Sequence, residues 1–214
     1  KVYDRIAKAL VTGQMRPKDQ LTIRCLSELV GVSSTPVRDA VKQLTHEQVL
    51  EMRSPKDVRV PVLTERSYLE ILDIRLSLEG LAAERATEHA SERQIGTLQR
   101  LLERNDQALA KRQWGIATEV NQRFHLALSE IAGMLHLQKI LNGLWLQMGP
   151  LIACYYDTEP DELNVHHFDL RNAMTSRDPG AARLAMQADL ASAKDAMLDQ
   201  IAVLRAEHFA EAAA

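Results

Sequence analysis

The chain has little that would tie it to an oxidising or membrane environment. Its 214 residues include two cysteines, Cys25 and Cys154, which cannot form a disulfide framework and are not spaced as a metal-binding pair. No apolar run approaches the roughly 20 residues of a membrane-spanning helix. The sequence also shows no basic, apolar and small-residue secretion signal. We therefore expect a cytoplasmic protein with no membrane-spanning segment.

Aromatic residues and glycines are also scarce, at 4% of the chain and nine residues. Ala, Leu, Glu and Arg are abundant instead, and they favour helices. The charge is unevenly divided. Residues 1–62 hold 11 Lys and Arg against 7 Asp and Glu (+4), and residues 63–214 hold 15 against 22 (−7), which together give the formal net charge of −3. A basic region joined to an acidic one indicates a part that binds a polyanion.

Hydrophobic periodicity predicts three helices and a hairpin in the basic region. Apolar residues recur with helical spacing over residues 2–10, 26–30 and 37–44, and Gly31 is placed to cap the end of the second helix. Two β-rich segments then flank the turn sequence SPKD. Two short helices joined by a tight glycine turn are typical of a helix-turn-helix, and a basic hairpin after them makes it a winged helix. We place this domain at residues 1–63.

The residue types around the third predicted helix suit contact with duplex DNA. Small hydroxyl residues at 33–35 lie at its N-terminus, where backbone N–H groups and the helix dipole can bind a phosphate. One turn further, the Arg38 guanidinium can reach guanine O6 and N7 in the major groove. The residues that we expect to contact DNA are Arg24, Ser33, Ser34, Thr35, Arg38, Lys42 and Lys56. The alternative is that these side chains are ordinary solvated surface groups.

From residue 64 onward the pattern favours helices and no strand is predicted. Capping residues mark several starts, among them Thr64, the capping-box pair Ser91 and Gln94, and Asp178. The predicted helices begin near residues 64, 91, 114, 135, 161 and 178, and the last reaches about residue 204. Such short connections predict an antiparallel bundle of six or seven helices over residues 64–208, so the fold class is mainly α.

Two polar residues of the third bundle helix share a face. Asn121 and His125 are four positions apart, so both side chains point the same way. A second histidine and an acidic residue on neighbouring helices would close a cation site inside the bundle. The alternative is structural, because a histidine on a helix face is more often a hydrogen-bonded core residue than a metal ligand.

The sequence LVGVSSTPVRDAVKQL at residues 29–44 resembles the N-terminal domain of the GntR family of bacterial transcription regulators, and GQMRP at residues 13–17 is similar to it as well. Members of that family carry a winged helix ahead of a variable effector domain. The resemblance implies DNA contacts at Arg24, Thr35 and Arg38.

Two positions depart from the family's pattern. The family usually has Arg where Ser34 stands, so one arginine contact is missing here. It also usually has Gly in the wing tip, where this chain reads SPKD. The negative charge of Asp57 in that tip opposes a close approach to the minor groove.

Three later motifs resemble the FadR C-terminal (FCD) type of effector domain. They are RLSLE at residues 75–79, NQRFH at 121–125 and HFDLRNAM at 167–174. Metal-binding members of this domain type use an Asp, a His four residues on, and two further His. The corresponding positions here are Asn121, His125, His167 and Asp189.

That set offers two imidazoles, one carboxylate and an amide oxygen, which suits Zn, Mn, Fe or Ni with positions left open for a ligand carboxylate. Two alternatives stay open: the substitutions have removed the metal and left a polar pocket, or His166 faces inward in place of His167. Arg75 can clamp a carboxylate effector bidentately, unless it is committed to Glu79 four residues on.

These features predict a ligand-responsive bacterial transcription repressor that binds palindromic operator DNA as a homodimer and senses a small organic acid, assisted by a divalent metal. We expect effector binding to act through the linker at residues 62–64 and the helix that carries Arg75. A metal-dependent enzyme is the alternative, since two His and a carboxylate can activate water, but we expect no catalytic residues. A structural adaptor that reads no sequence is the third class.

Overall fold

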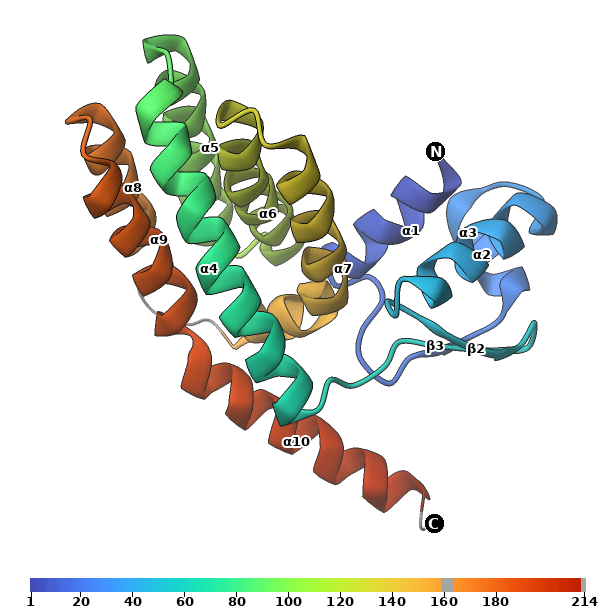
Figure 1. Ribbon diagram of the computed structural model, residues 1–214. Coiled ribbons are helices and arrows are strands. Elements are labelled where there is room, and N and C mark those ends of the chain that lie inside the picture. Colours follow the sequence, from blue (N-terminus) through green and yellow to red (C-terminus); the bar gives the residue numbers. More distant parts are fainter. Residues whose placement is uncertain (159–163, 213–214) are drawn as a thin grey trace.

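The computed structural model of the chain describes residues 1–158 and 164–212, with side chains as far as residue 206. A small N-terminal part with a sheet lies beside a larger helical bundle (Figure 1). The N-terminal part runs in the order α1 (Val2–Val11), β1 (Gln20–Leu21), α2 (Ile23–Val30), α3 (Ser34–His46), β2 (Glu51–Ser54) and β3 (Asp57–Arg59). This is the predicted winged helix-turn-helix.

Local chemistry sets the bounds of α2. The Thr22 side chain accepts a hydrogen bond from the Cys25 N–H and so caps the start of the helix. Gly31 ends it at a φ of +66°, in the left-handed region that glycine adopts without strain. The turn between α2 and α3 is therefore the tight glycine turn that the sequence predicts.

The wing is a three-stranded antiparallel sheet in the order β1-β3-β2. The predicted hairpin forms, with Met52 opposite Val58 and an irregularity between Met52 and Ser54. β1 was not predicted, because a two-residue strand has no readable alternation. It exists because Leu21 pairs with Val58 from a distant part of the chain.

The bundle consists of α4 (Glu65–His89), α5 (Glu92–Ala110), α6 (Trp114–Ile131), α7 (Leu135–Asp157), α8 (Val165–Thr175), α9 (Pro179–Ser192) and α10 (Lys194–Ala212). Thr64 caps α4 by accepting from the Ser67 N–H, and Ser91 and Gln94 form the predicted capping box of α5. None of the helices in the described residues combines the length and apolarity that a bilayer crossing requires.

Two predicted helices differ from the structure. The single last helix, expected from Asp178 to about residue 204, is two helices that meet at Ala193. No Gly or Pro marks this junction in the sequence. The predicted start of the fifth bundle helix near residue 161 lies outside the described residues, and α8 itself begins at Val165. α7 passes through Pro150 as one helix and reaches Asp157.

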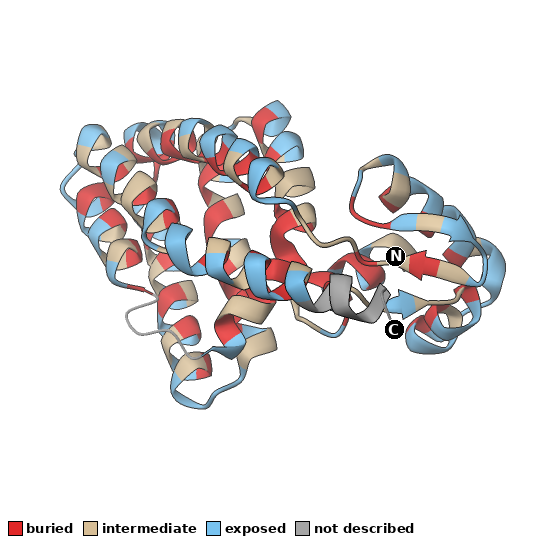
Figure 2. Ribbon diagram, turned by 90° about the horizontal axis from the view of Figure 1, so that it is seen from below, coloured by how far each residue is buried: buried red, intermediate tan, exposed pale blue. Residues whose placement is uncertain are grey.

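Buried hydrophobic side chains form two clusters, and Figure 2 shows the buried positions along both parts. One cluster fills the bundle. The other fills the winged helix, and it includes Leu146 of α7. One bundle helix therefore contributes a side chain to the core of the N-terminal part.

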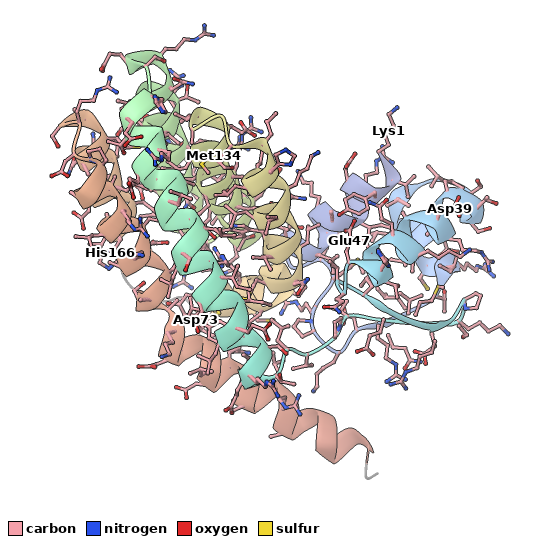
Figure 3. All side chains as sticks on the ribbon, in the orientation of Figure 1. Lys1, Asp39, Glu47, Asp73, Met134 and His166 are labelled. Carbon is pink, nitrogen blue, oxygen red and sulfur yellow. The ribbon has the colours of Figure 1, made fainter. Side chains whose placement is uncertain are left out.

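Polar contacts reinforce this junction between α1, α6 and α7. Lys8 pairs with Glu119 at 2.7 Å, and Arg16 pairs with Asp157 at 2.7 Å. The Gln147 side chain donates a 3.1 Å hydrogen bond to the backbone oxygen of Glu47, which follows α3. Glu47 is labelled in Figure 3, on the side of the winged helix that faces the bundle.

Candidate metal centre and nucleic-acid interface

The predicted DNA-contacting residues are all exposed. Ser33 is the N-cap of α3, as predicted, but its side chain makes no capping hydrogen bond. The first turn of α3 therefore presents backbone N–H groups and small hydroxyls outward, together with the positive end of the helix dipole. This arrangement suits a phosphate oxygen, and Arg38 follows one turn along the same exposed helix.

Part of the predicted set lines one concave surface between α2, α3 and the wing tip. Its lining includes Arg24, Ser33, Ser34 and Arg38. Within the described part of the chain, Arg24 forms a 3.0 Å surface ion pair with Glu28, which is worth little and leaves the side chain able to turn toward a duplex. Thr35, Lys42 and Lys56 are exposed but lie outside this concave lining.

The acidic residue of the wing tip is neutralised within the wing. Asp57 accepts hydrogen bonds of 2.8 and 3.3 Å from Arg59. The hydrogen bond from Arg59 keeps the pKa of the Asp57 carboxyl below its ordinary value. The tip also packs back on α2, because the Ile23 N–H donates to the Pro55 oxygen at 2.9 Å. Asp57 therefore repels a nucleic acid less than its sequence position suggests.

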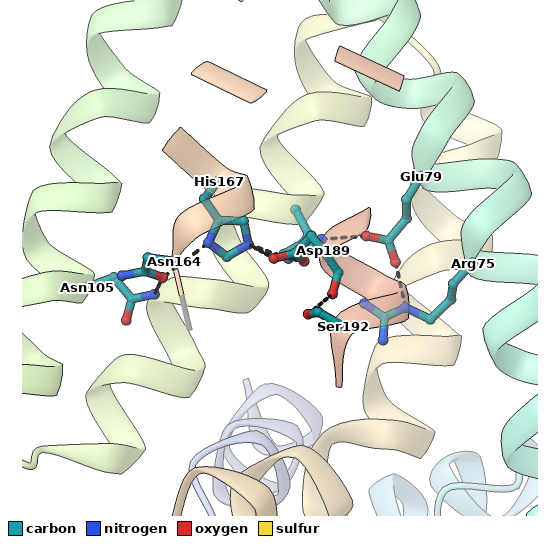
Figure 4. A network of polar contacts seen from close by, with 8 residues as sticks. Arg75, Glu79, Asn105, Asn164, His167, Asp189 and Ser192 are labelled. Carbon is teal, nitrogen blue, oxygen red and sulfur yellow. Dashed lines mark hydrogen bonds and ion pairs between the residues drawn. The ribbon is translucent and has the colours of Figure 1, made fainter. Parts of the chain in front are cut away.

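Inside the bundle, three of the four predicted metal positions converge. The ligand atoms of His125 of α6, His167 of α8 and Asp189 of α9 lie close together. Figure 4 labels His167 and Asp189, which point toward one another. The two Nε2 atoms are 3.1 Å apart, and the Asp189 carboxylate lies 3.1 Å from Nε2 of His167 and 3.4 Å from Nε2 of His125. Both imidazoles are almost fully buried.

A shell of hydrogen bonds fixes which ring nitrogens carry protons. Nδ1 of His125 donates to the Glu79 carboxylate at 2.6 Å. Nδ1 of His167 lies 3.1 Å from Oδ1 of Asn164, whose amide nitrogen donates to Asp106 at 2.6 Å. Because the Asn164 nitrogen is used by a carboxylate, its oxygen faces His167, and the Nδ1 of His167 must be the donor.

The chemistry of this donor set fits a cation. With both Nδ1 atoms donating, two Nε2 atoms and a carboxylate face one another, so the cluster needs a positive charge, which a proton on an imidazole or a cation between the three groups can supply. The fourth predicted position supports the same conclusion. Asn121 is 8% exposed and lines the same cavity, and its Oδ1 has no hydrogen-bond partner among the described residues. A buried acceptor without a partner is expensive, and a metal ion would satisfy it.

Arg75 lies beside this cluster. One of its nitrogens is paired with Glu79, and the others are available to a ligand. Its Nε donates to Glu79 at 2.5 Å, so the ion pair that the sequence offered as an alternative does form. The guanidinium also stacks on Trp145, 4.2 Å from the ring centre. Its two terminal nitrogens make no hydrogen bond to the described residues and remain available to a ligand.

The carboxylates of Glu79, which is buried, and Asp189, which is 14% exposed, are held in the charged form. Burial alone would raise the pKa of Glu79, but the charges of Arg75 and then His125 outweigh it, so the pKa lies below its ordinary value. The same balance applies to Asp189. Burial acts to raise its pKa, and the charge and hydrogen bond of His167 lower it further than burial raises it.

Sequence reasoning missed the residues that orient the two imidazoles. Glu79 was read only as a partner of Arg75, and Asn164 was not noticed. Asn164 lies three residues before His167, and this spacing could have indicated that the two side chains meet. His166 was the alternative histidine. Its side chain also lines the cavity, but it is 33% exposed, lies 3.6 Å from Asp169 and is not one of the three side chains whose ligand atoms converge. Figure 3 labels it on the outer edge of the bundle. His167 is the inward one.

Comparison with known proteins agrees with both parts of this description. Residues 1–60 match the family described as "Bacterial regulatory proteins, gntR family", and residues 70–192 match the family described as "FCD domain". The chain is 32% identical over 166 residues to the HTH-type transcriptional regulator McbR of Escherichia coli (strain K12), covering 77% of this chain and 75% of that protein.

A second relative is the probable D-xylose utilization operon transcriptional repressor of Paenarthrobacter nicotinovorans, 26% identical and covering 73% of this chain and 70% of that protein. The solved structure of E. coli McbR/YncC superposes with a TM-score of 0.81 at 29% identity, covering 97% of this chain and 96% of that one. The matched domains and these relatives are transcription regulators and not enzymes.

Proposed function

The chain belongs to the GntR family of bacterial regulatory proteins and carries an FCD domain, and from this premise we propose that it is a ligand-responsive repressor that binds palindromic operator DNA as a homodimer. Residues 1–63 form the DNA-binding domain and residues 64–208 the effector-binding and dimerisation domain. A regulator of this kind acts in the cytoplasm, where bacterial operators are. The name of the Paenarthrobacter relative supports repression as the sign of the control.

One observation carries this proposal. An exposed helix start that suits DNA and a cavity with a polar cluster that suits the carboxylate of a small acid are joined through α7, which contributes to both parts. A ligand in the cavity can therefore bias the placement of the winged helix. An enzyme would leave the winged helix without a role, and an adaptor would leave the buried cluster without one.

The divalent metal belongs to the same proposal. His125, His167 and Asp189 would hold it, with Asn121 as a weak oxygen ligand, and Zn, Mn, Fe or Ni all suit such a set. When bound, the ion supplies positive charge that attracts the carboxylate of an effector. Glu79 and Asn164 hold the imidazoles in the tautomer that metal binding requires, and Arg75 orients the effector carboxylate.

The test of the regulator is the recognition helix. We expect Arg38→Ala to weaken specific binding about tenfold to a hundredfold, because a bidentate base contact is worth roughly 1–3 kcal/mol. Fluorescence anisotropy with a duplex selected from a random library by the parent protein measures this. Arg93→Ala is the matched control, since Arg93 is an exposed arginine on α5 of the bundle. Equal affinities for the parent and Arg38→Ala would contradict the assignment.

A further inference from the structure

The cavity beside the histidine cluster extends well beyond the polar groups. Its volume is about 340 Å³, within the range of cavities that hold small ligands. Arg75, His125, His167 and Asp189 line one part of it. The remaining lining is mostly apolar and includes Leu72, Ile152, Leu190 and Met197.

Helix geometry separates the polar and apolar ends. On α4, Tyr68 precedes Arg75 by seven residues, which at 1.5 Å per residue is about 10 Å along the axis. On α7, Trp145 stacks on Arg75, and Ile152 lies seven residues further on, again about 10 Å away. The start of α4 and the end of α7 both lie toward α10, to which Met197 belongs (Figure 1). The apolar walls therefore meet at one end of the cavity.

The apolar end offers little to a polar ligand. The polar groups that line the cavity beyond the cluster are the phenols of Tyr68, Tyr155 and Tyr156, His166, which lies 3.6 Å from Asp169, and Ser192, whose hydroxyl already donates to the backbone of Asp189 at 2.7 Å. Burial raises the pKa of Tyr68 to about 12, so its phenol stays neutral at physiological pH. A hydroxyl of a sugar acid that faces Leu72, Ile152 or Met197 would have no partner there and would cost about 1–3 kcal/mol, which disfavours such a ligand along these walls.

The polar end fits a single carboxylate. Arg75 and Glu79 cancel each other's charge, and Asp189 adds one negative charge. A divalent ion on the proposed metal site turns this into one net positive charge, which one carboxylate neutralises. Trp145 also lines the cavity, and its Nε1 is a buried donor with no partner among the described residues.

We propose that the effector is a monocarboxylic acid with an apolar tail that spans about 10 Å, the length of seven helical residues. Its carboxylate binds the metal and the terminal nitrogens of Arg75. Its tail lies between Leu72, Ile152 and Met197, toward the start of α10. This assignment rests on the proposed function, because it places the acid in the proposed effector site.

The experiment is a calorimetric titration of the full-length, zinc-loaded protein with acetate, butyrate, hexanoate, octanoate and gluconate. Burial of a methylene group predicts an affinity gain of about fourfold for each one added, with gluconate binding no tighter than acetate. DNA affinity is followed in parallel by anisotropy, and octanoate should weaken it at the lowest concentration. A gain for each methylene that follows this order supports the proposal.

Variants locate the tail. Ile152→Asn and, as a second route if that variant folds poorly, Met197→Gln should flatten the dependence on chain length. Ile140→Asn is the control, because Ile140 lies on the same helix but is 53% exposed, and it should leave that dependence unchanged.

The outcomes separate two failures. If acetate binds and releases DNA but octanoate binds no tighter, or if gluconate binds tightest, the tail proposal is overturned and the regulator stands. If the chain-length dependence survives in both Ile152→Asn and Met197→Gln, the tail lies elsewhere and the proposal is likewise overturned. If no acid binds and DNA affinity never changes, both the tail and the proposed effector function are overturned.

Discussion

Glu79 contacts both His125, a proposed metal ligand, and Arg75, the proposed contact of the effector carboxylate. One carboxylate accepts hydrogen bonds from Arg75 and from His125, and all three side chains are buried. Removing one member of such a buried network leaves an uncompensated charge, which costs about 3–5 kcal/mol. The proposed effector contact and the proposed metal ligand are therefore fixed by the same group.

The first prediction concerns the proposed ligands. The double variant His125→Ala with His167→Ala should lose bound metal, because two of the three convergent donors disappear and the remaining carboxylate binds weakly alone. Elemental analysis after zinc loading and dialysis measures this. His166→Ala is the matched control, since it removes the neighbouring histidine that is not one of the three convergent ligands, and it should keep the metal of the parent. Equal metal content in the double variant and the parent would refute the site.

The sequence indicated the positions of the proposed metal ligands, but it did not indicate the residues that orient them through hydrogen bonds. Asn121 and His125 share a helix face, which spacing alone reveals, and a family resemblance supplied His167 and Asp189. The structure brings His125, His167 and Asp189 together and places Asn121 in the same cavity. The tautomer-setting contacts could not be read in this way, because Glu79 and His125 meet across two helices 46 positions apart. Only the packing of α4 on α6 creates that contact.

Among the helices, α7 lines the cavity with one set of side chains and packs against the winged helix with another. Trp145, Met148 and Ile152 line the cavity. Leu146 lies in the core of the winged helix, and Gly149 touches α1. The two parts are therefore connected in two ways. The linker at residues 62–64 joins them covalently, and α7 joins them through direct packing contacts.

Gly149 shows how tight this contact is. A Cβ at that position would lie 3.2 Å from Cγ2 and 3.3 Å from Cα of Val11. We expect Gly149→Ala to destabilise the protein by about 1–3 kcal/mol, the usual effect of overpacking, and to shift α1. Gly143→Ala is the control on the same helix, because a Cβ there meets nothing within 4 Å. It should stabilise the helix by roughly 0.5–1 kcal/mol.

Urea denaturation of the two variants measures both effects, and DNA titrations of each show whether the α1 contact matters for operator binding. A Gly149→Ala variant that is as stable as Gly143→Ala would show that α1 and α7 do not pack closely in solution.

Elements with local signals were predicted well, and elements made by distant contacts were not. The caps at Thr64 and Ser91 are hydrogen bonds within one turn, so four residues of sequence are enough to reveal them. β1 forms only because β3 pairs with it. The break at Ala193 has no signal in the local sequence, since alanine is itself a good helix former, and α10 beyond it packs on α7 and α4.

For the whole molecule, the recognition helix and the cavity lie in different parts, with the winged helix beside one end of the bundle (Figure 1). The basic excess of residues 1–62 and the acidic excess of the remainder match this division. DNA affinity should therefore fall steeply with salt, since each phosphate contact releases a counterion.

The last prediction concerns assembly. The proposed homodimer has a mass of twice 24.0 kDa and should bind a palindrome with half-sites about one helical turn, ~34 Å, apart. Light scattering after size exclusion measures the mass. Titration of the palindrome against a single half-site duplex gives the stoichiometry. A chain that stays monomeric both free and on the palindrome would contradict the dimer.

The double role of α7 also sets the terms on which this protein could be re-engineered as a biosensor. Mutating positions 145–156 to admit a different inducer would also disturb the packing of α1 on α7. Inducer preference and the level of transcription without inducer would therefore change together. Among the described residues, Leu190 and Met197 belong to the core cluster of the bundle and not to that of the winged helix. Libraries confined to these two positions would retune what the sensor detects while leaving the contact between α1 and α7 alone.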